Sequence, residues 1–126
     1  MIRLLVVCLS GAIGAGVRYL VGLWAAGRLG TAFPYGTLCV NLAGCFLIGL
    51  IMQLSIELTN FPPTLRLALT TGFLGGLTTY SSFNYETLAL AGNGATRLAL
   101  LNLGVTVGGC AIAGVLGLLL GRWLVG

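Results

Sequence analysis

Four long apolar segments constrain the fold of this chain more than any other feature. They run from about residue 4 to 26, 36 to 57, 65 to 91 and 98 to 124 of the 126 residues. A helix needs about 20 apolar residues to cross a bilayer, and each segment reaches that length. The connections are short, and Pro34 and the Pro62–Pro63 pair punctuate the first two. The sequence therefore predicts one all-α membrane domain over residues 1–126, with four transmembrane helices and no soluble domain.

Charged residues are scarce, at 6% of the chain against about 25% in soluble domains. The six basic residues are all arginines spread singly along the sequence, so they form no nucleic-acid-binding patch. Histidine is absent, and Glu57 and Glu86 are the only carboxylates. Because the commonest general base is missing, the composition argues against an enzyme.

The four cysteines, Cys8, Cys39, Cys45 and Cys110, each lie in an apolar run, and none forms a CxxC pair. This pattern predicts neither a disulfide framework nor a zinc site. We interpret the cysteines as small buried hydrophobic residues.

The third apolar segment contains a sequence that is unfavourable for a continuous helix. Gly75–Gly76 is followed closely by Thr78–Thr79. Glycine loses much backbone entropy in a helix, and hydroxyl groups offer the backbone other hydrogen-bond partners. In lipid, such a break is tolerated only where protein or water satisfies the freed backbone groups. We therefore expect the third helix to be broken near the membrane middle, with carbonyl groups free to hold a cation.

Polar residues within the apolar segments are candidates for function, because they are expensive in lipid. Asn41 is interpreted either as a hydrogen-bonding link between helices or as part of a pathway. Asn102, Thr106 and Cys110 follow one another at i, i+4 and i+8, so they share one helix face. That stripe is typical of close packing or of one wall of a polar track.

Two charged residues lie off-centre in their segments. Glu86 is eight residues past Thr78, or about 12 Å along a helix. This distance favours the solvated end of an aqueous vestibule over a proton-coupling carboxylate. Arg18 can extend its side chain to the interface, or attract anions to the mouth of a vestibule.

Tyr80 and Phe83 follow the predicted break at i, i+3 spacing, among the hydroxyls of Thr79, Ser81 and Ser82. Ordinary packing is one interpretation of the two rings. The other uses the positive edge of an aromatic ring. Ring edges that point into a narrow pathway could partly replace water around a small anion without binding it tightly.

The arginines give almost no instruction about orientation. The two sides of the membrane would each receive three of them: Arg3, Arg66 and Arg122 on one side, and Arg18, Arg28 and Arg97 on the other. Since a Lys/Arg bias sets topology, either folding decides the orientation or copies insert both ways and pair antiparallel. Three small-xxx-small pairs permit close helix contact, which packing inside one chain explains in part and a homodimer explains better. They are Gly72 and Gly76, Gly104 and Gly108, and Gly117 and Gly121.

The motif GFLGGLTTYSSF at 72–83, with GTLCVNLAG at 36–44 and GAGVRY at 14–19, resembles the Fluc (CrcB) family of fluoride channels. The resemblance covers the whole chain. It implies a fluoride-selective channel of the plasma (inner) membrane that exports fluoride passively from the cytoplasm and relieves its toxicity. It also implies an antiparallel, dual-topology homodimer with a structural sodium ion at the interface.

Carried over by motif, the sodium would be held by the backbone carbonyls of Gly75 and Thr78. The residues expected along the fluoride pathway are Asn41, Tyr80, Phe83, Ser81, Ser82, Thr106, Cys110, Arg18 and Glu86. Two departures concern rate and selectivity. The family commonly has Phe where this chain has Tyr80, and a hydroxyl where it has Cys110, whose thiol is a weaker hydrogen-bond donor.

Two rival functions start from the same composition. A small dual-topology multidrug or cation exporter usually needs a carboxylate deep in its first span, and this chain has none there. A membrane scaffold would explain the packing glycines, but it gives no reason for a polar break flanked by aromatic residues.

Overall fold

A computed structural model describes residues 1–126 and contains helices without strands. Its elements are α1 (Ile2–Leu29), α2 (Tyr35–Glu57), α3 (Pro63–Leu67), η1 (Ala68–Leu74), α4 (Gly75–Leu77), α5 (Tyr80–Gly92) and α6 (Thr96–Val125). The first three parts of the third segment form one helical stretch, in which η1 is a π-helix. The predicted all-α class is confirmed; α2 ends at Glu57 as expected, and the other ends of the four segments extend one to three residues past the expected boundaries.

Helix ends follow local sequence signals. α1 ends before Gly30, whose φ of 82° is available to glycine at little steric cost. Gly94 has a φ of 80° in the turn between α5 and α6. Pro63 opens α3, where its missing N–H is not needed. These signals keep the connections short and place successive helices antiparallel.

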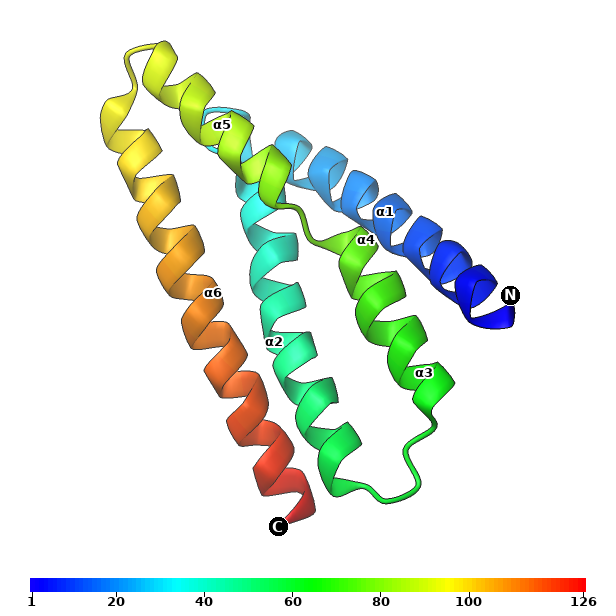
Figure 1. Cartoon of the computed structure of the whole chain (residues 1–126). Helices are drawn as coiled ribbons and strands as arrows, with labels where there is room; N and C mark the ends of the chain where they lie inside the picture. Colours follow the sequence, from blue (N-terminus) through cyan, green and yellow to red (C-terminus); the bar gives the residue numbers. More distant parts are fainter.

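The helices form an open bundle around α2 (Figure 1). α2 packs most extensively against α6, and α1 packs against α2, η1 and α4. α5, in contrast to η1 and α4, packs mainly against α6. The third segment therefore changes its partner from α1 to α6 between α4 and α5.

Glycines allow the closest helix contacts. A Cβ at Gly14 would collide with the Phe73 carbonyl oxygen, and one at Gly76 with the Gly11 carbonyl oxygen. On the other side of the bundle, a Cβ at Gly117 would collide with the Phe46 carbonyl oxygen of α2. By contrast, Gly104 and Gly108 have no neighbour within 4 Å, so this small-xxx-small pair has no packing role inside one chain.

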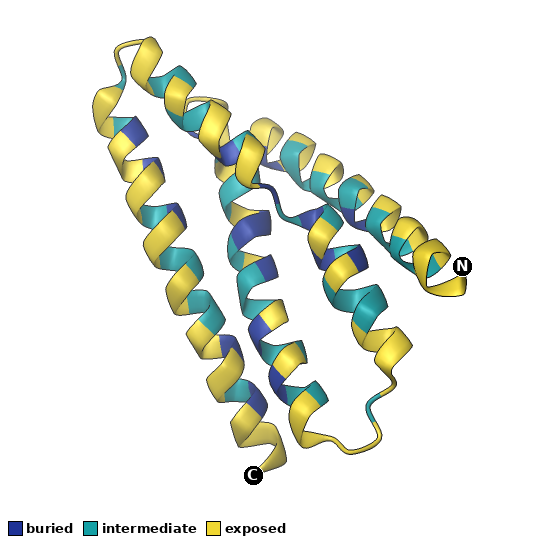
Figure 2. Cartoon of the chain, viewed as in Figure 1, coloured by how far each residue is buried: buried dark blue, intermediate teal, exposed yellow.

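Few residues are buried, and they form a thin line along the inside of the bundle (Figure 2). Only 18 of the 126 residues are buried, and five of these are polar: Asn41, Gln53, Thr79, Asn102 and Thr106. Most large apolar side chains point outward. Three helices, α1, α2 and α6, are long and apolar enough to cross a membrane. An apolar exterior, with the few polar groups held inside the bundle, suits a lipid environment.

The cysteines do not all follow the expected burial. Cys8 and Cys39 are exposed, so their interpretation as buried residues is wrong. Their small apolar side chains lie on outward faces of α1 and α2, which lipid can cover. Cys45 and Cys110 are half-buried.

Candidate functional site

The site begins at two extended residues that separate α4 from α5. Thr78 has φ −84° and ψ 156°, and Thr79 has φ −152° and ψ 117°. Both glycines of the Gly75–Gly76 pair remain helical in α4. The extended residues are therefore the threonines, whereas Gly76 serves close packing against α1.

Asn41 on α2 binds the extended backbone through both ends of its amide. The Thr79 N–H donates to Asn41 Oδ1 at 2.8 Å, and Asn41 Nδ2 donates to the Thr79 carbonyl at 3.0 Å. Asn41 is only 7% exposed. The side chain thus replaces the helical partners of one peptide unit, which is what a backbone break in an apolar setting requires.

Thr79 also caps the first turn of α5. Its Oγ1 accepts a hydrogen bond from the Ser82 N–H at 3.1 Å, donates to Ser82 Oγ at 3.1 Å, and lies 3.3 Å from Ser81 Oγ. This is the usual role of a threonine at a helix N-cap. Three hydroxyls therefore gather at the start of α5, on the residues expected from the sequence.

Two carbonyls lose their ordinary helical partners at this point. In a continuous helix, the Thr79 N–H would reach the Gly75 carbonyl and the Ser82 N–H would reach the Thr78 carbonyl. Here the first donates to Asn41 and the second to Thr79 Oγ1. The carbonyl oxygens of Gly75 and Thr78 thus lack the N–H donors that a continuous helix would give them. They are the two oxygens that the family resemblance predicts as cation ligands.

A pocket of about 410 Å³ opens beside the break, between α2, the third segment and α6. It brings together seven of the predicted site residues: Asn41, Gly75, Thr78, Tyr80, Phe83, Thr106 and Cys110. The other four, Arg18, Ser81, Ser82 and Glu86, are outside its lining. No formally charged side chain lines the pocket.

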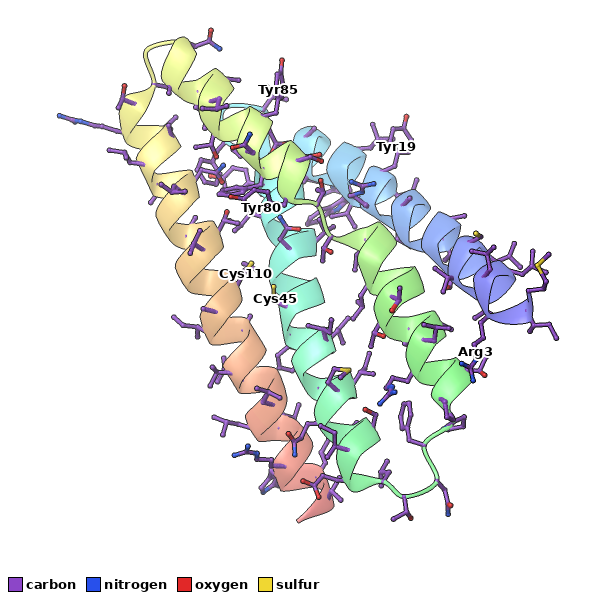
Figure 3. The ribbon with its side chains drawn as sticks, viewed as in Figure 1. Arg3, Tyr19, Cys45, Tyr80, Tyr85 and Cys110 are labelled. Carbon is purple, nitrogen blue, oxygen red and sulfur yellow. The ribbon has the colours of Figure 1, made fainter.

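The aromatic pair lies at one end of this pocket. The rings of Tyr80 and Phe83 pack edge to face, with centroids 5.6 Å apart and planes inclined by 66°. Phe83 is 3% exposed, whereas Tyr80 is 77% exposed and projects from the chain. The two residues therefore have different surroundings, although both line the pocket (Figure 3).

A chain of hydrogen bonds links α6 to α5 behind the aromatic pair. Thr106 Oγ1 donates to Asn102 Oδ1 at 3.3 Å, and Asn102 Nδ2 donates to Thr87 Oγ1 at 2.9 Å. Thr87 Oγ1 in turn donates to the Phe83 carbonyl at 2.7 Å. Asn102 is 1% exposed, so it positions Thr106 from within the bundle. The sequence showed Asn102 in the α6 stripe, but nothing indicated Thr87.

Glu86 lies in a separate polar group near the α1–α2 connection. Thr37 Oγ1 donates to Glu86 Oε1 at 2.8 Å, whereas the buried Glu86 Oε2 has no hydrogen-bond partner. Thr37 lay within the quoted second-segment motif, yet its sequence position gave no sign of this contact. A donor at the free oxygen, such as water, would complete the group.

Shared lining residues connect these groups. Thr79 lines both the main pocket and a second one of about 270 Å³, which contains Arg18 and Ser82. Thr37 lines this second pocket and a third of about 370 Å³, which contains Glu86. A line of polar groups thus runs from Cys110 past the break to Arg18 and Glu86. The arrangement offers hydrogen-bond donors along a path with little fixed charge.

Comparison with known proteins gives matches over nearly the whole chain. The family model described as CrcB-like protein, Camphor Resistance (CrcB), matches residues 5–118. A protein of Anaeromyxobacter sp. (strain K) named fluoride-specific ion channel FluC is 52% identical over 126 residues, which is 100% of both chains. Proteins of the same name from Citrifermentans bemidjiense and Chloroflexus aurantiacus are 47% and 48% identical over 97% and 98% of this chain, and over 98% of their own lengths.

Proposed function

The chain belongs to the CrcB-like protein family, and on that premise we propose that it is a fluoride-selective ion channel rather than an enzyme. The observation that carries this proposal is the uncharged pocket beside the break. It combines the buried Phe83 with the thiol of Cys110 and with Asn41, whose Nδ2 has a second hydrogen beyond the one donated to Thr79. These weak donors suit an anion that must enter a site and leave it again.

Transport through such a pathway is passive. A small anion gives up part of its water shell to hydroxyl, amide and thiol donors, and to the positive edge of an aromatic ring. Because no charged side chain lines the main pocket, no side chain there forms an ion pair that would trap the anion. Arg18 lines the adjoining pocket, where it favours the arrival of anions.

Selectivity follows from ion size and hydration. Chloride is larger than fluoride and gains less from close hydrogen-bond donors. Inside a neutral cytoplasm, HF that has entered releases its proton and leaves fluoride trapped as an anion. A passive channel in the plasma (inner) membrane relieves this trap, and so counters fluoride toxicity without an energy source.

The working unit of this integral membrane protein is an antiparallel homodimer. One chain leaves the pocket open on a side lined by the exposed residues Gly75 and Tyr80. The unfilled surface at Gly104 and Gly108 permits close approach of another helix. The equal number of arginines on the two sides of the membrane also supports the antiparallel dimer, because it allows insertion in both orientations.

A sodium ion at the interface suits the donors at the break. Sodium is a hard cation, and hard cations prefer oxygen ligands. The Gly75 and Thr78 carbonyls are available because their helical donors bind Asn41 and Thr79 instead. The positive charge of this ion, near the membrane middle, would hold together the interrupted backbones of the two copies.

Ion flux from liposomes tests the proposed function. Purified protein should release loaded fluoride, measured with a fluoride electrode, and release chloride far more slowly. Phe83→Ile should lose fluoride flux while the protein still assembles, because the aliphatic side chain fills space without an aromatic edge. Equal rates for the two anions would refute a fluoride-selective channel.

No observation favours the two rival functions. No carboxylate lines the main pocket, as proton exchange in a multidrug exporter would require. Glu86 is engaged with Thr37 in a separate pocket. A scaffold would show no transport, so the fluoride measurement also separates it from a channel.

A further inference from the structure

Two cysteines from different helices meet in the main pocket. Cys45 belongs to α2 and Cys110 to α6, and both are half-buried free thiols. Figure 3 shows their side chains pointing toward one another across the space between the two helices. Both thiols line the pocket that holds Phe83 and Thr106.

The contact between α2 and α6 holds this pair in place. A Cβ at Gly49 would collide with the Gly114 carbonyl oxygen, and one at Gly117 with the Phe46 carbonyl oxygen. Helices in such close backbone contact have little freedom to separate. The two helices that carry the sulfurs are therefore held in a fixed relation, and the two thiols face one pocket without a large movement of either helix.

The chemistry of two thiols selects a narrow class of ligand. Thiolates are soft ligands and prefer soft metal ions over the hard cations that carboxylates bind. No group of three or more Cys, His, Asp or Glu side chains exists that could hold a metal ion. A pair without further ligands suits ions that accept linear two-coordination, namely Cu⁺, Ag⁺ and Hg²⁺.

We propose that Cys45 and Cys110 form a dithiol site that binds one soft, linearly coordinated metal cation and thereby closes the pathway. For Hg²⁺, two sulfur–mercury bonds form, two S–H bonds break, and two protons pass to water, without oxidation or reduction. The bound ion lies between α2 and α6, in the pocket that Phe83 and Thr106 also line. The block of flux rests on the proposed channel function, whereas metal binding does not.

Binding is tested with Hg²⁺ in a full-length variant that retains only this pair. Cys8→Ala and Cys39→Ala remove the two exposed thiols, which lie outside the pocket. Intact mass should show one mercury per chain with the loss of two hydrogens. Competition with glutathione should show binding roughly a hundredfold or more tighter than after a further Cys45→Ser or Cys110→Ser change, because the second thiol binds intramolecularly.

Fluoride efflux from liposomes tests whether the two-thiol metal site lies in the fluoride pathway. Hg²⁺ should stop efflux in the pair-only variant, and dithiothreitol should restore it. In each single-thiol variant, inhibition is expressed relative to that variant's own untreated flux, and it should require a correspondingly higher Hg²⁺ concentration.

Distinct results would overturn the two parts of this inference. Equal affinity for Hg²⁺ in the pair-only and single-thiol variants would rule out a two-thiol site. Tight binding with unchanged efflux would place the site outside the pathway. Absence of fluoride efflux before any metal is added would instead overturn the proposed function, and the binding measurement would stand.

Discussion

Asn41 is the residue on which the local structure of the break depends. It satisfies both the N–H and the carbonyl of Thr79 from a neighbouring helix, in a position almost closed to solvent. A buried backbone group without a partner costs about 1–3 kcal/mol. Asn41 therefore positions the main pocket as well as lining it, because its amide fixes the backbone that carries Tyr80 and Phe83.

Replacing Asn41 with alanine should lower the free energy of unfolding by about 1–3 kcal/mol, because it leaves the Thr79 peptide unit unpaired. Equilibrium denaturation in detergent micelles measures the loss. Cys39→Ala is the control on the same helix, since Cys39 is exposed and outside the main pocket, and it should leave the free energy of unfolding nearly unchanged. An alanine variant as stable as the original protein would show that the amide does not hold the break.

Thr79 has a second role that a pair of substitutions can isolate. Thr79→Val keeps the branched shape but removes the acceptor of the Ser82 N–H, so it should lower stability by about 0.5–2 kcal/mol. Thr79→Ser keeps the hydroxyl and should remain closer to the original protein. Thermal unfolding of the two variants makes the comparison. If serine is as harmful as valine, the methyl group rather than the cap is responsible.

At the scale of elements, the third segment consists of two helical parts with different partners. The part that ends with α4 packs on α1, whereas α5 packs on α6. The glycines of α4 fit the first contact, since a side chain at Gly76 would strike the backbone of α1. The break therefore lets one transmembrane segment bridge both sides of the bundle.

Gly76→Ala should destabilise the protein by about 1–3 kcal/mol, because the added methyl group meets the Gly11 carbonyl oxygen. Gly16→Ala is a suitable control, since nothing lies within 4 Å of a Cβ there. Alanine favours a helix interior by up to about 1 kcal/mol over glycine, so the control should be neutral or stabilising. Equal effects in a denaturation experiment would contradict the packing role of Gly76.

The sequence indicated the helices better than it indicated their contacts. Four apolar segments were enough to predict the all-α class, because a membrane-spanning helix satisfies its own backbone. The pairing of Asn41 with Thr79 could not be predicted, since it joins residues 38 positions apart. The glycine pair was misleading at Gly76, where the small residue serves contact with α1 while the extended backbone lies at the threonines. The position of the break relative to the bilayer stays a prediction.

At the scale of the whole molecule, the arginines allow a test of dual topology. The connection 58–62 and the two termini share one side of the bundle, and the connection 93–95 lies on the other. Lysine added by Asn60→Lys or by Asn93→Lys should bias insertion in opposite senses. Each variant expressed alone should lose fluoride flux, and the two expressed together should restore it. Full activity of either variant alone would contradict the antiparallel dimer.

The proposed sodium ion predicts a dependence of assembly on the cation present. Ligands that bind only the assembled state stabilise it by mass action. Exchanging sodium for N-methylglucamine at constant ionic strength should therefore lower the temperature at which the dimer dissociates, with potassium as a second comparison. Identical dissociation curves in the three salts would leave the Gly75 and Thr78 carbonyls without a sodium role.

The open side of the main pocket has a consequence for newly made protein. Acyl chains cannot hydrogen-bond with the Gly75 and Thr78 carbonyls beside it, so in the proposed dimer these groups lack a partner until a second copy covers that side. The amount of solitary protein in a cell should accordingly stay low, through rapid pairing or removal by membrane proteases. If removal is faster than pairing, the number of finished pores rises with the square of gene dosage, whereas rapid pairing makes that number proportional to gene dosage.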